Sequence, residues 1–493
     1  MRTIARSVSA IAFAALLPAL RAQAPAADPA PPITLGGVTV SGSLRSRVYF
    51  WDWFQPTAGN NDYQYSGNIF RIGLSQHLDS WDWNDEFAVP FFLGLPAGAT
   101  GTGSQQGALG LGSNYVSANS GSQYTALIFP KQLFARLDGL GGNKNHTLQV
   151  GRFEFADGGE VAPKNATLAA VKRDRVAQRL IGVFGFSDVG RSFDGVHYAY
   201  NTASDNVTFV AAVPTRGVFQ VDGWGWNRVG FGYTSYTHQW GSGRHAADTR
   251  LFFIEYDDFR HILKTDNRAL AVRRADLANI RIDTYGGHTL HAVDTGAGTV
   301  DLLLWGALQT GRWGVETQRS AAADVEGGFQ PKIAGPLRPW LRGGYTYGSG
   351  DGNPNDNQHG TFFQLMPTPR LYARFPFFNM MNTEDRFGIL QIRPHRKVTI
   401  SSEFHALRLS NANDFWYGGG GVFQPWTFGY TGRSTSGRRS LANLYDTQLD
   451  CRVNRRLTLT GYVGYAQGLA AMEEIYPAGK NGKFGYLEFL HRF

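Results

Sequence analysis

Hydrophobic and polar side chains alternate with a period of two along many segments of this chain. Successive side chains of a β-strand point to opposite faces, so this period predicts strands, and two such segments separated by a short turn predict a hairpin. The clearest segments are residues 42–51, 397–406, 444–453 and 457–468. A soluble sandwich and a membrane barrel share this period, so the alternation alone does not decide between them.

Composition favours the membrane barrel. The chain has 493 residues, of which 14% are aromatic and 61 are Gly, and its mean hydropathy is −0.27. After the N-terminus it has no long apolar run of the kind that a helical membrane protein needs. Its apolar content is too high for a disordered chain. Many aromatics and glycines with weak mean hydropathy are typical of a closed antiparallel β-barrel.

The N-terminus predicts export. Residues 1–24 combine Arg2 and Arg6, an apolar stretch and a small-residue AQA site, which is the pattern of a secretory signal peptide. We expect a short lead over residues 25–35 and one barrel domain over residues 36–493, placed in a bacterial outer membrane. Cys451 is the single cysteine, so the chain has no internal disulfide and no cysteine-based metal site.

Aromatic positions support the membrane location. The chain ends at Phe493, with Leu487 and Phe489 on the same face, and this end resembles the C-terminal signature through which the barrel assembly machinery recognises outer-membrane barrels. Tryptophan recurs at period two, which suits an interfacial girdle, although a sugar-stacking platform or plain core would use the same spacing. The pairs are Trp51/Trp53, Trp81/Trp83 and Trp224/Trp226.

A long uncharged stretch lies between two predicted strands. Residues 94–122 are rich in Gly, Ser and Asn, and no charged residue occurs between Glu86 and Lys131. This composition is too polar and too rich in glycine for a helix, so we expect a long loop. The loop either covers or enters the pore, or it is an extracellular loop with no role in gating.

Two stretches resemble the alginate export family of outer-membrane porins. Residues 148–200 contain GRFE, an Asp-Gly turn, RLIGV and RSFDGV, and residues 343–372 contain GGYTYGSGD followed by GTFF and a proline. The resemblance implies a barrel of about 18 strands with a basic lumen that conducts an anionic uronate polymer. We also expect contacts with outer-membrane lipid and lipopolysaccharide. The sequence leaves open whether a periplasmic partner delivers the polymer.

Basic residues are the candidate pore chemistry. The chain has 47 Lys and Arg against 39 Asp and Glu, and only nine of the basic residues are lysines. Guanidinium forks suit carboxylate geometry better than Lys point charges do. A charge that faces lipid at the bilayer midplane costs about 2 to 4 kcal/mol, so strand arginines are expected to face the lumen.

Alternation assigns particular residues to the lumen. Arg152 and Glu154 alternate with two phenylalanines, and the tract KRDRVAQR (172–179) places three arginines on one face if it is extended. Arg191 is included through the resemblance alone. The candidate pore-lining residues are Arg45, Arg47, Arg152, Glu154, Asp157, Arg173, Arg175, Arg179, Arg191, Asp194 and Arg342. The acidic members of this set would reduce the positive potential of the lumen. Alternatively, they would form ion pairs with arginines that only stabilise the barrel wall.

Other functions remain as alternatives. A general diffusion porin for small anionic or sugar solutes would use the same scaffold. An outer-membrane hydrolase is the rival class, but the chain has no G-x-S-x-G or H-E-x-x-H motif. The loop at residues 351–356 loosely resembles a calcium loop, and a polar turn explains it better. We expect no cofactor, no metal and no nucleic-acid partner.

Overall fold

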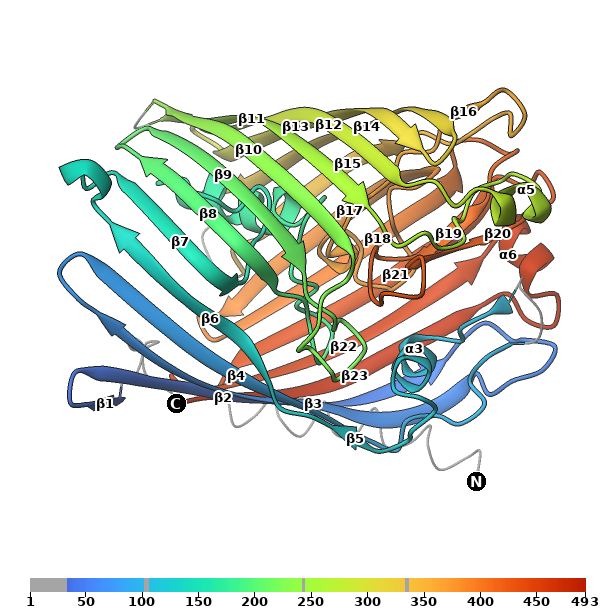
Figure 1. Cartoon of the computed structure of the whole chain (residues 1–493), viewed down its shortest axis with the longest axis horizontal. Coiled ribbons are helices and arrows are strands. Elements are labelled where there is room, and N and C mark those ends of the chain that lie inside the picture. The colour runs from blue at the N-terminus through green and yellow to red at the C-terminus, as the bar shows by residue number, and fades with distance from the viewer. Residues whose placement is uncertain (1–32, 102–105, 242–243, 333–336) are drawn as a thin grey trace.

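The computed structural model describes residues 33–101, 106–241, 244–332 and 337–493. Within them the chain forms a closed antiparallel β-barrel of 18 strands, as the sequence predicts (Figure 1). The barrel closes where β2 pairs with β23 on one side and with β3 on the other. The predicted signal peptide over residues 1–24 lies outside the described residues, as does most of the lead.

The strands of the barrel follow one another around the wall in sequence order. They are β2 (Val38–Asp52), β3 (Asp62–His77), β4 (Trp81–Leu93), β6 (Phe129–Asp138), β7 (His146–Phe153), β8 (Phe193–Asn201), β9 (Asp205–Pro214), β10 (Val229–Trp240), β11 (His245–Asp258), β12 (Ile280–Asp294), β13 (Gly298–Trp313), β14 (Glu316–Pro331), β15 (Trp340–Gly348), β17 (Thr383–His395), β18 (Val398–Leu409), β21 (Ser440–Arg452), β22 (Leu457–Gly468) and β23 (Gly482–Arg492).

Smaller elements lie between these strands. The short strands are β1 (Ile33–Leu35), β5 (Thr125–Ala126), β16 (Gln358–His359), β19 (Trp416–Gly419) and β20 (Tyr430–Arg433). The helical segments are α3 (Leu111–Ala118), η2 (Leu140–Gly142), α4 (Ala166–Val171), the π-helical η3 (Lys172–Val176), α5 (Leu270–Ala275), η4 (Pro369–Leu371) and α6 (Ala470–Ile475). None of the helices in the described ranges is long and apolar enough to cross a membrane.

The two ends of the barrel differ. At one end short turns join the strands, for example residues 78–80 and 396–397, and Figure 1 shows the C-terminus at this end. At the other end most connections are long, and α3, α5, α6 and the β19–β20 hairpin lie there. We call them the short-turn end and the long-loop end.

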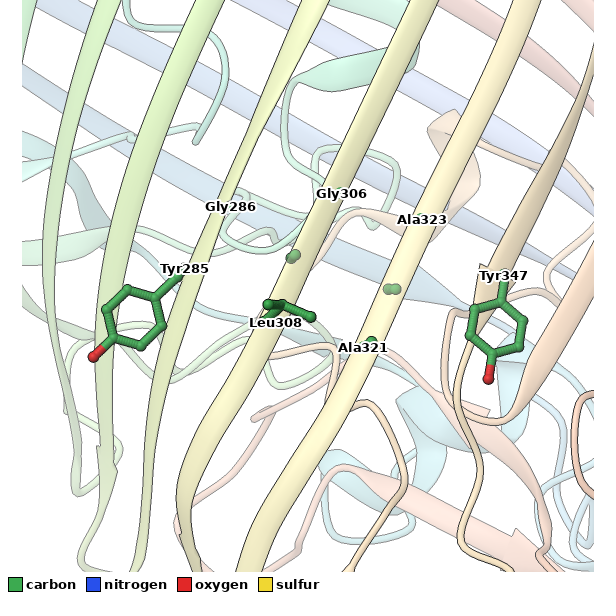
Figure 2. Close-up of a pocket in the computed structure, with 9 residues that line it drawn as sticks. Tyr285, Gly286, Gly306, Leu308, Ala321, Ala323 and Tyr347 are labelled. Atoms are coloured by element: carbon green, nitrogen blue, oxygen red, sulfur yellow. The ribbon is translucent and has the colours of Figure 1, made fainter.

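The outer face of the wall is apolar because the strands alternate. On β2, Val48 is 44% exposed on the outside, whereas its neighbours Arg47 and Tyr49 are buried inside. The outer face also has a shallow apolar depression over β12–β15, where glycines and alanines lie between Tyr285 and Tyr347 (Figure 2). An apolar outer surface and a polar inner surface are what a barrel in lipid requires.

The seam between the first and last barrel strands is closed by the C-terminal residue. The Gly42 amide donates to the Phe493 carbonyl at 3.0 Å, and the Phe493 amide donates back to Gly42 at 3.0 Å. A Cβ atom at Gly42 would collide with the Phe493 ring, so glycine allows the ring to cover the seam.

The long-loop half of the barrel is filled by protein. Loops 154–192, 349–382 and 410–439 fold inward and bury an apolar core that includes Phe362, Phe363 and Met366. Loop 154–192 extends further, because Lys164 donates to the Ala203 carbonyl in the β8–β9 turn at 2.8 Å, so part of this loop reaches the short-turn end. The inward Arg71 side chain on β3 is 26% exposed.

Two predictions about this half were wrong. Trp51 and Trp53 do not join an interfacial girdle: they share the inner face with Arg47 and are buried, with Trp51 stacked on Phe484 at 4.2 Å between ring centroids. Part of the stretch 94–122, contrary to the expectation of no helix, forms α3 over residues 111–118, because its apolar and small residues pack into the barrel mouth, where Tyr115 is fully buried.

Candidate functional site

The tract KRDRVAQR is π-helical over residues 172–176 and ends in a turn, so the prediction of an extended face with three arginines was wrong. Asn165 caps α4 by accepting hydrogen bonds from two backbone amides, and the chain continues directly into η3. The helical turn separates the arginines. Arg173 faces solvent and pairs with Asp174 at 2.6 Å, whereas Arg175 points into the barrel.

A buried cluster of three arginines and three carboxylates joins loop 154–192 to the barrel wall. Arg175 pairs with Glu326 on β14 at 2.8 Å, and Arg179 pairs with Asp324 at 2.6 Å. Arg342 on β15 pairs with Glu326 and with Asp301. We call these six residues the β14 cluster. Its charges balance, and the Arg179 side chain is only 1% exposed, so it fixes the loop rather than presenting charge to a solute.

Two further predicted carboxylates also brace inward loops. Asp157 is fully buried and accepts hydrogen bonds from the amides of Leu180 at 3.0 Å and Ile181 at 2.8 Å. It also pairs with Arg250 on β11 at 3.4 Å. Glu154 pairs with Arg71 at 3.3 Å and is 29% exposed, so this pair is in contact with solvent.

Arg45 and Arg47 converge on one buried carboxylate. Asp188 accepts hydrogen bonds from Arg45 at 3.3 Å and from the Tyr49 hydroxyl at 2.7 Å, and it lies 3.6 Å from Arg47. The Tyr115 hydroxyl on α3 accepts a hydrogen bond from the Asp188 amide at 3.0 Å. Asp188 thus offsets both predicted lumen arginines and anchors α3. The sequence analysis did not single it out, because no local pattern marks it.

Arg152 and Asp194 lie on the outer side of the wall, so their assignment to the lumen was wrong. Arg152 stands opposite Leu133 in the β6–β7 ladder, and opposite residues share a face. Leu133 is 52% exposed on the outside. The charges are tolerated because Arg152 forms a bidentate pair with Asp194, 2.7 Å at both contacts, and donates to carbonyls of loop 215–228.

Loop 215–228 also carries the exposed indoles of Trp224 and Trp226. Both side chains are more than half exposed at this outer rim, and Trp226 donates to Asp194. Aromatic side chains that cover an ion pair at the barrel rim suit an interface between lipid and water.

Arg191 links three inward loops through hydrogen bonds. It is fully buried and donates to the carbonyls of Gly182 at 2.9 Å, Met366 at 2.8 Å and Val422 at 3.1 Å. Burial without a carboxylate partner lowers the pKa of Arg191 to about 10. The residue that the family motif singled out therefore positions the loops that shape the pore.

These loops enclose a cavity of about 560 Å³ at the long-loop end. Thirteen of its 35 lining residues are aromatic, and they come from the end of β2, from loop 215–228 and from loops 154–192, 349–382 and 410–439. The aromatic lining residues include Trp51, Trp53, Phe186, Phe375, Trp416 and Phe423. We call it the aromatic cavity.

The charged lining residues of the aromatic cavity are Arg370 and Arg433. Among the described residues, neither arginine has a carboxylate within 4 Å. The sequence analysis named neither of them, because both lie in loops where alternation carries no information. The sequence did contain one signal for these two residues. Each arginine lies in a long loop rich in glycine and phenylalanine and has aromatic residues near it in sequence.

The loop at residues 351–356, which loosely resembles a calcium loop in sequence, forms turns of its own. Asp351 accepts a hydrogen bond from the Asn353 amide at 3.0 Å, and Asn353 accepts one from the Asn355 amide at 3.2 Å. These side-chain oxygens are used within the loop, as in a run of Asx turns.

A closed barrel with an apolar exterior and a polar lumen defines a channel of the outer membrane. The chain belongs to the alginate export family, whose model, described as "Alginate export", matches residues 130–474, more than half of the chain. Family and fold thus point to a channel, which is a non-enzymatic role.

Solved structures of outer-membrane porins share the fold. Acinetobacter baumannii OccAB4 superposes with a TM-score of 0.56 at 7% identity, covering 92% of this chain and 98% of that chain. Pseudomonas aeruginosa OccK9 (OpdG) gives 0.53 at 12% identity, with the same two coverages. At these identities the likeness concerns the fold alone. No curated protein matches the chain significantly.

Proposed function

We propose that this outer-membrane channel passes anionic uronate chains, as the family description suggests. The observation that carries the proposal is the aromatic cavity, in which arginines are the charged lining residues while the wall arginines are matched by carboxylates. A carboxylate that enters the cavity meets two arginines, neither of which has a carboxylate within 4 Å in the described ranges. Several such weak contacts in series favour passage over trapping.

A channel for small anionic or sugar solutes is the second candidate, and the filled half of the barrel favours it. The inward core around Phe363 and Met366 leaves a space of the size that encloses small ligands, for which typical pockets are roughly 300 to 1,000 Å³. A short piece of a uronate chain fits this space, whereas a wide polymer tunnel would not need such a core.

Planar bilayers distinguish these functions. Purified full-length protein should conduct anions in preference to cations, as read from the reversal potential in a salt gradient. Soluble oligouronates should reduce the current, and a block that strengthens with chain length favours the polymer. Block by single-ring uronates alone would favour the small-solute channel. Cation preference without block would overturn the uronate proposal.

A further inference from the structure

Four polar side chains face outward on β13 and β14, close to the long-loop end of the wall. Arg312 lies opposite Thr317 in the ladder of these two strands, and Thr310 lies opposite Arg319. All four side chains are exposed. Leu308 on β13 is 60% exposed on the outside, and alternation puts Thr310 and Arg312 on the same face. We call these four residues the arginine–threonine patch.

The two arginines of the patch lie near each other without a counter-charge. Arg312 and Arg319 are diagonal neighbours across the strand pair, a position that separates the residues by about 7 to 8 Å. Among the described residues, neither guanidinium has a carboxylate oxygen within 4 Å. Like charges at such close positions repel each other, so an anion between them would be stabilising.

The acidic residues of this outer face lie on the β11–β12 side of the patch. Glu255 and Asp283 oppose each other on these strands, and Asp257 pairs with Arg281 at 2.7 Å. On β13 and β14 the arginines alternate instead with threonines, whose hydroxyls can donate to an anion. The unpaired positive charge is therefore concentrated on β13 and β14.

The apolar depression of the outer face begins directly beside the patch, on the same two strands. Leu308 and Ala321 line the depression, and they lie two residues from Thr310 and Arg319, about 7 Å along each strand. A molecule that spans both surfaces must therefore join an anionic group to an apolar chain.

Two tyrosines mark the level at which the polar surface begins. Figure 2 shows the hydroxyls of Tyr285 and Tyr347 pointing along the wall from Ala323 toward Ala321, which is the direction of the patch. A tyrosine on a lipid-facing wall keeps its ring among acyl chains and its hydroxyl among headgroups. The patch thus lies at the headgroup level, and the depression lies at the level of the acyl chains.

We propose that this surface binds lipid A, the phosphorylated and acylated anchor of lipopolysaccharide, with a phosphate on Arg312 and Arg319 and an acyl chain in the depression. Short turns of outer-membrane barrels face the periplasm and long loops face the exterior, so the patch lies in the outer leaflet. Guanidinium forks match phosphate oxygens in pairs.

The β13–β14 connection leaves this surface open to lipid. It consists of residues 314 and 315 alone, whereas most connections at the long-loop end are long. The site lies on the outside of the wall, so it is independent of the solute that the lumen conducts.

Native mass spectrometry of the detergent-solubilised full chain tests the site. The probes are bis-phosphorylated lipid A, the same lipid without its phosphates, and phosphatidylglycerol. We expect lipid A to stay bound in clear preference to the other two. Equal retention of the dephosphorylated lipid would show that phosphate is not recognised, and equal retention of phosphatidylglycerol would show that any anionic lipid suffices. Either result overturns the proposal.

Paired substitutions locate the phosphate contact. Replacing both arginines of the patch, Arg312→Gln with Arg319→Gln, should lower the affinity for lipid A about 10- to 100-fold, since each arginine beside an anionic lipid contributes roughly a factor of five. The matched control is Arg455→Gln with Arg456→Gln, which removes two exposed arginines from the short turn 453–456 and should leave the affinity unchanged. Equal losses in the two double variants would show a general charge effect and contradict the site.

Filling the depression tests the acyl contact separately. A Cβ atom at Gly306 would meet only the Ala322 carbonyl oxygen, at 3.7 Å, so Gly306→Leu extends into the depression without disturbing the strand. We expect the affinity for lipid A to fall about 3- to 10-fold, because the acyl chain loses its surface. Unfolding midpoints measured without lipid should match the wild type in all variants. Unchanged affinity in Gly306→Leu would overturn the placement of the acyl chain.

Discussion

The β14 cluster and the aromatic cavity both contain buried arginines, but the surroundings differ. In the β14 cluster every arginine meets a carboxylate, and the charges hold a loop against the wall. In the aromatic cavity, Arg370 and Arg433 lie against rings and carbonyls instead. The partners of an arginine, rather than its presence in the lumen, decide whether it braces the barrel or attracts a solute.

Breaking the β14 cluster should have the largest effect. Arg179→Ala leaves Asp324 buried without its partner, so we expect a loss of about 3 to 5 kcal/mol in the free energy of unfolding. Urea unfolding in detergent micelles, followed by tryptophan fluorescence, measures it. An exposed pair contributes about 1 kcal/mol or less, so Arg173→Ala is the matched control. Equal losses in the two variants would show that the cluster does not hold the loop.

Removing a carboxylate that pairs with wall arginines should leave positive charge unbalanced there, as it is in the aromatic cavity. Asp188→Asn keeps the shape of the side chain and removes the charge that offsets Arg45 and Arg47. We expect anion preference to rise in bilayers, because Arg45 loses its carboxylate partner, while Arg47 keeps only its pair with Glu488 on β23 at 2.6 Å. The reversal potential reports this change. Tyr115→Phe, which removes only a hydroxyl beside Asp188, is the control, and an unchanged preference in Asp188→Asn would refute the comparison.

The smallest effect is expected at Arg173. Arg173→Glu reverses a charge on an exposed turn, where it pairs only with its neighbour Asp174. Anion preference at 0.15 M salt should change less than in Asp188→Asn, because Asp174 already offsets the Arg173 charge at 2.6 Å and salt screens an exposed charge over a Debye length of about 8 Å. A large fall in preference would place Arg173 beside the solute path after all.

Alternation predicted the barrel because strand periodicity is a local property of the sequence. It also placed Arg45, Arg47 and Arg342 on the inner face, where the structure has them. It failed at Arg152, where a loop distant in sequence shelters an ion pair on the outer face. Alternation could not predict the aromatic cavity, because loops line it. The inward packing of these loops depends on contacts between residues distant in sequence, such as those of Arg191.

The pairing of Phe493 with Gly42 gives one residue control over one end of the ring of strands. The Gly42 amide and carbonyl lie on the edge of β2 that meets β23, and Phe493 satisfies both. Without Phe493 these two groups would have no partner at the end of the seam, and an unpaired backbone group is costly in lipid. Loss of this residue is therefore expected to fray the seam from the short-turn end.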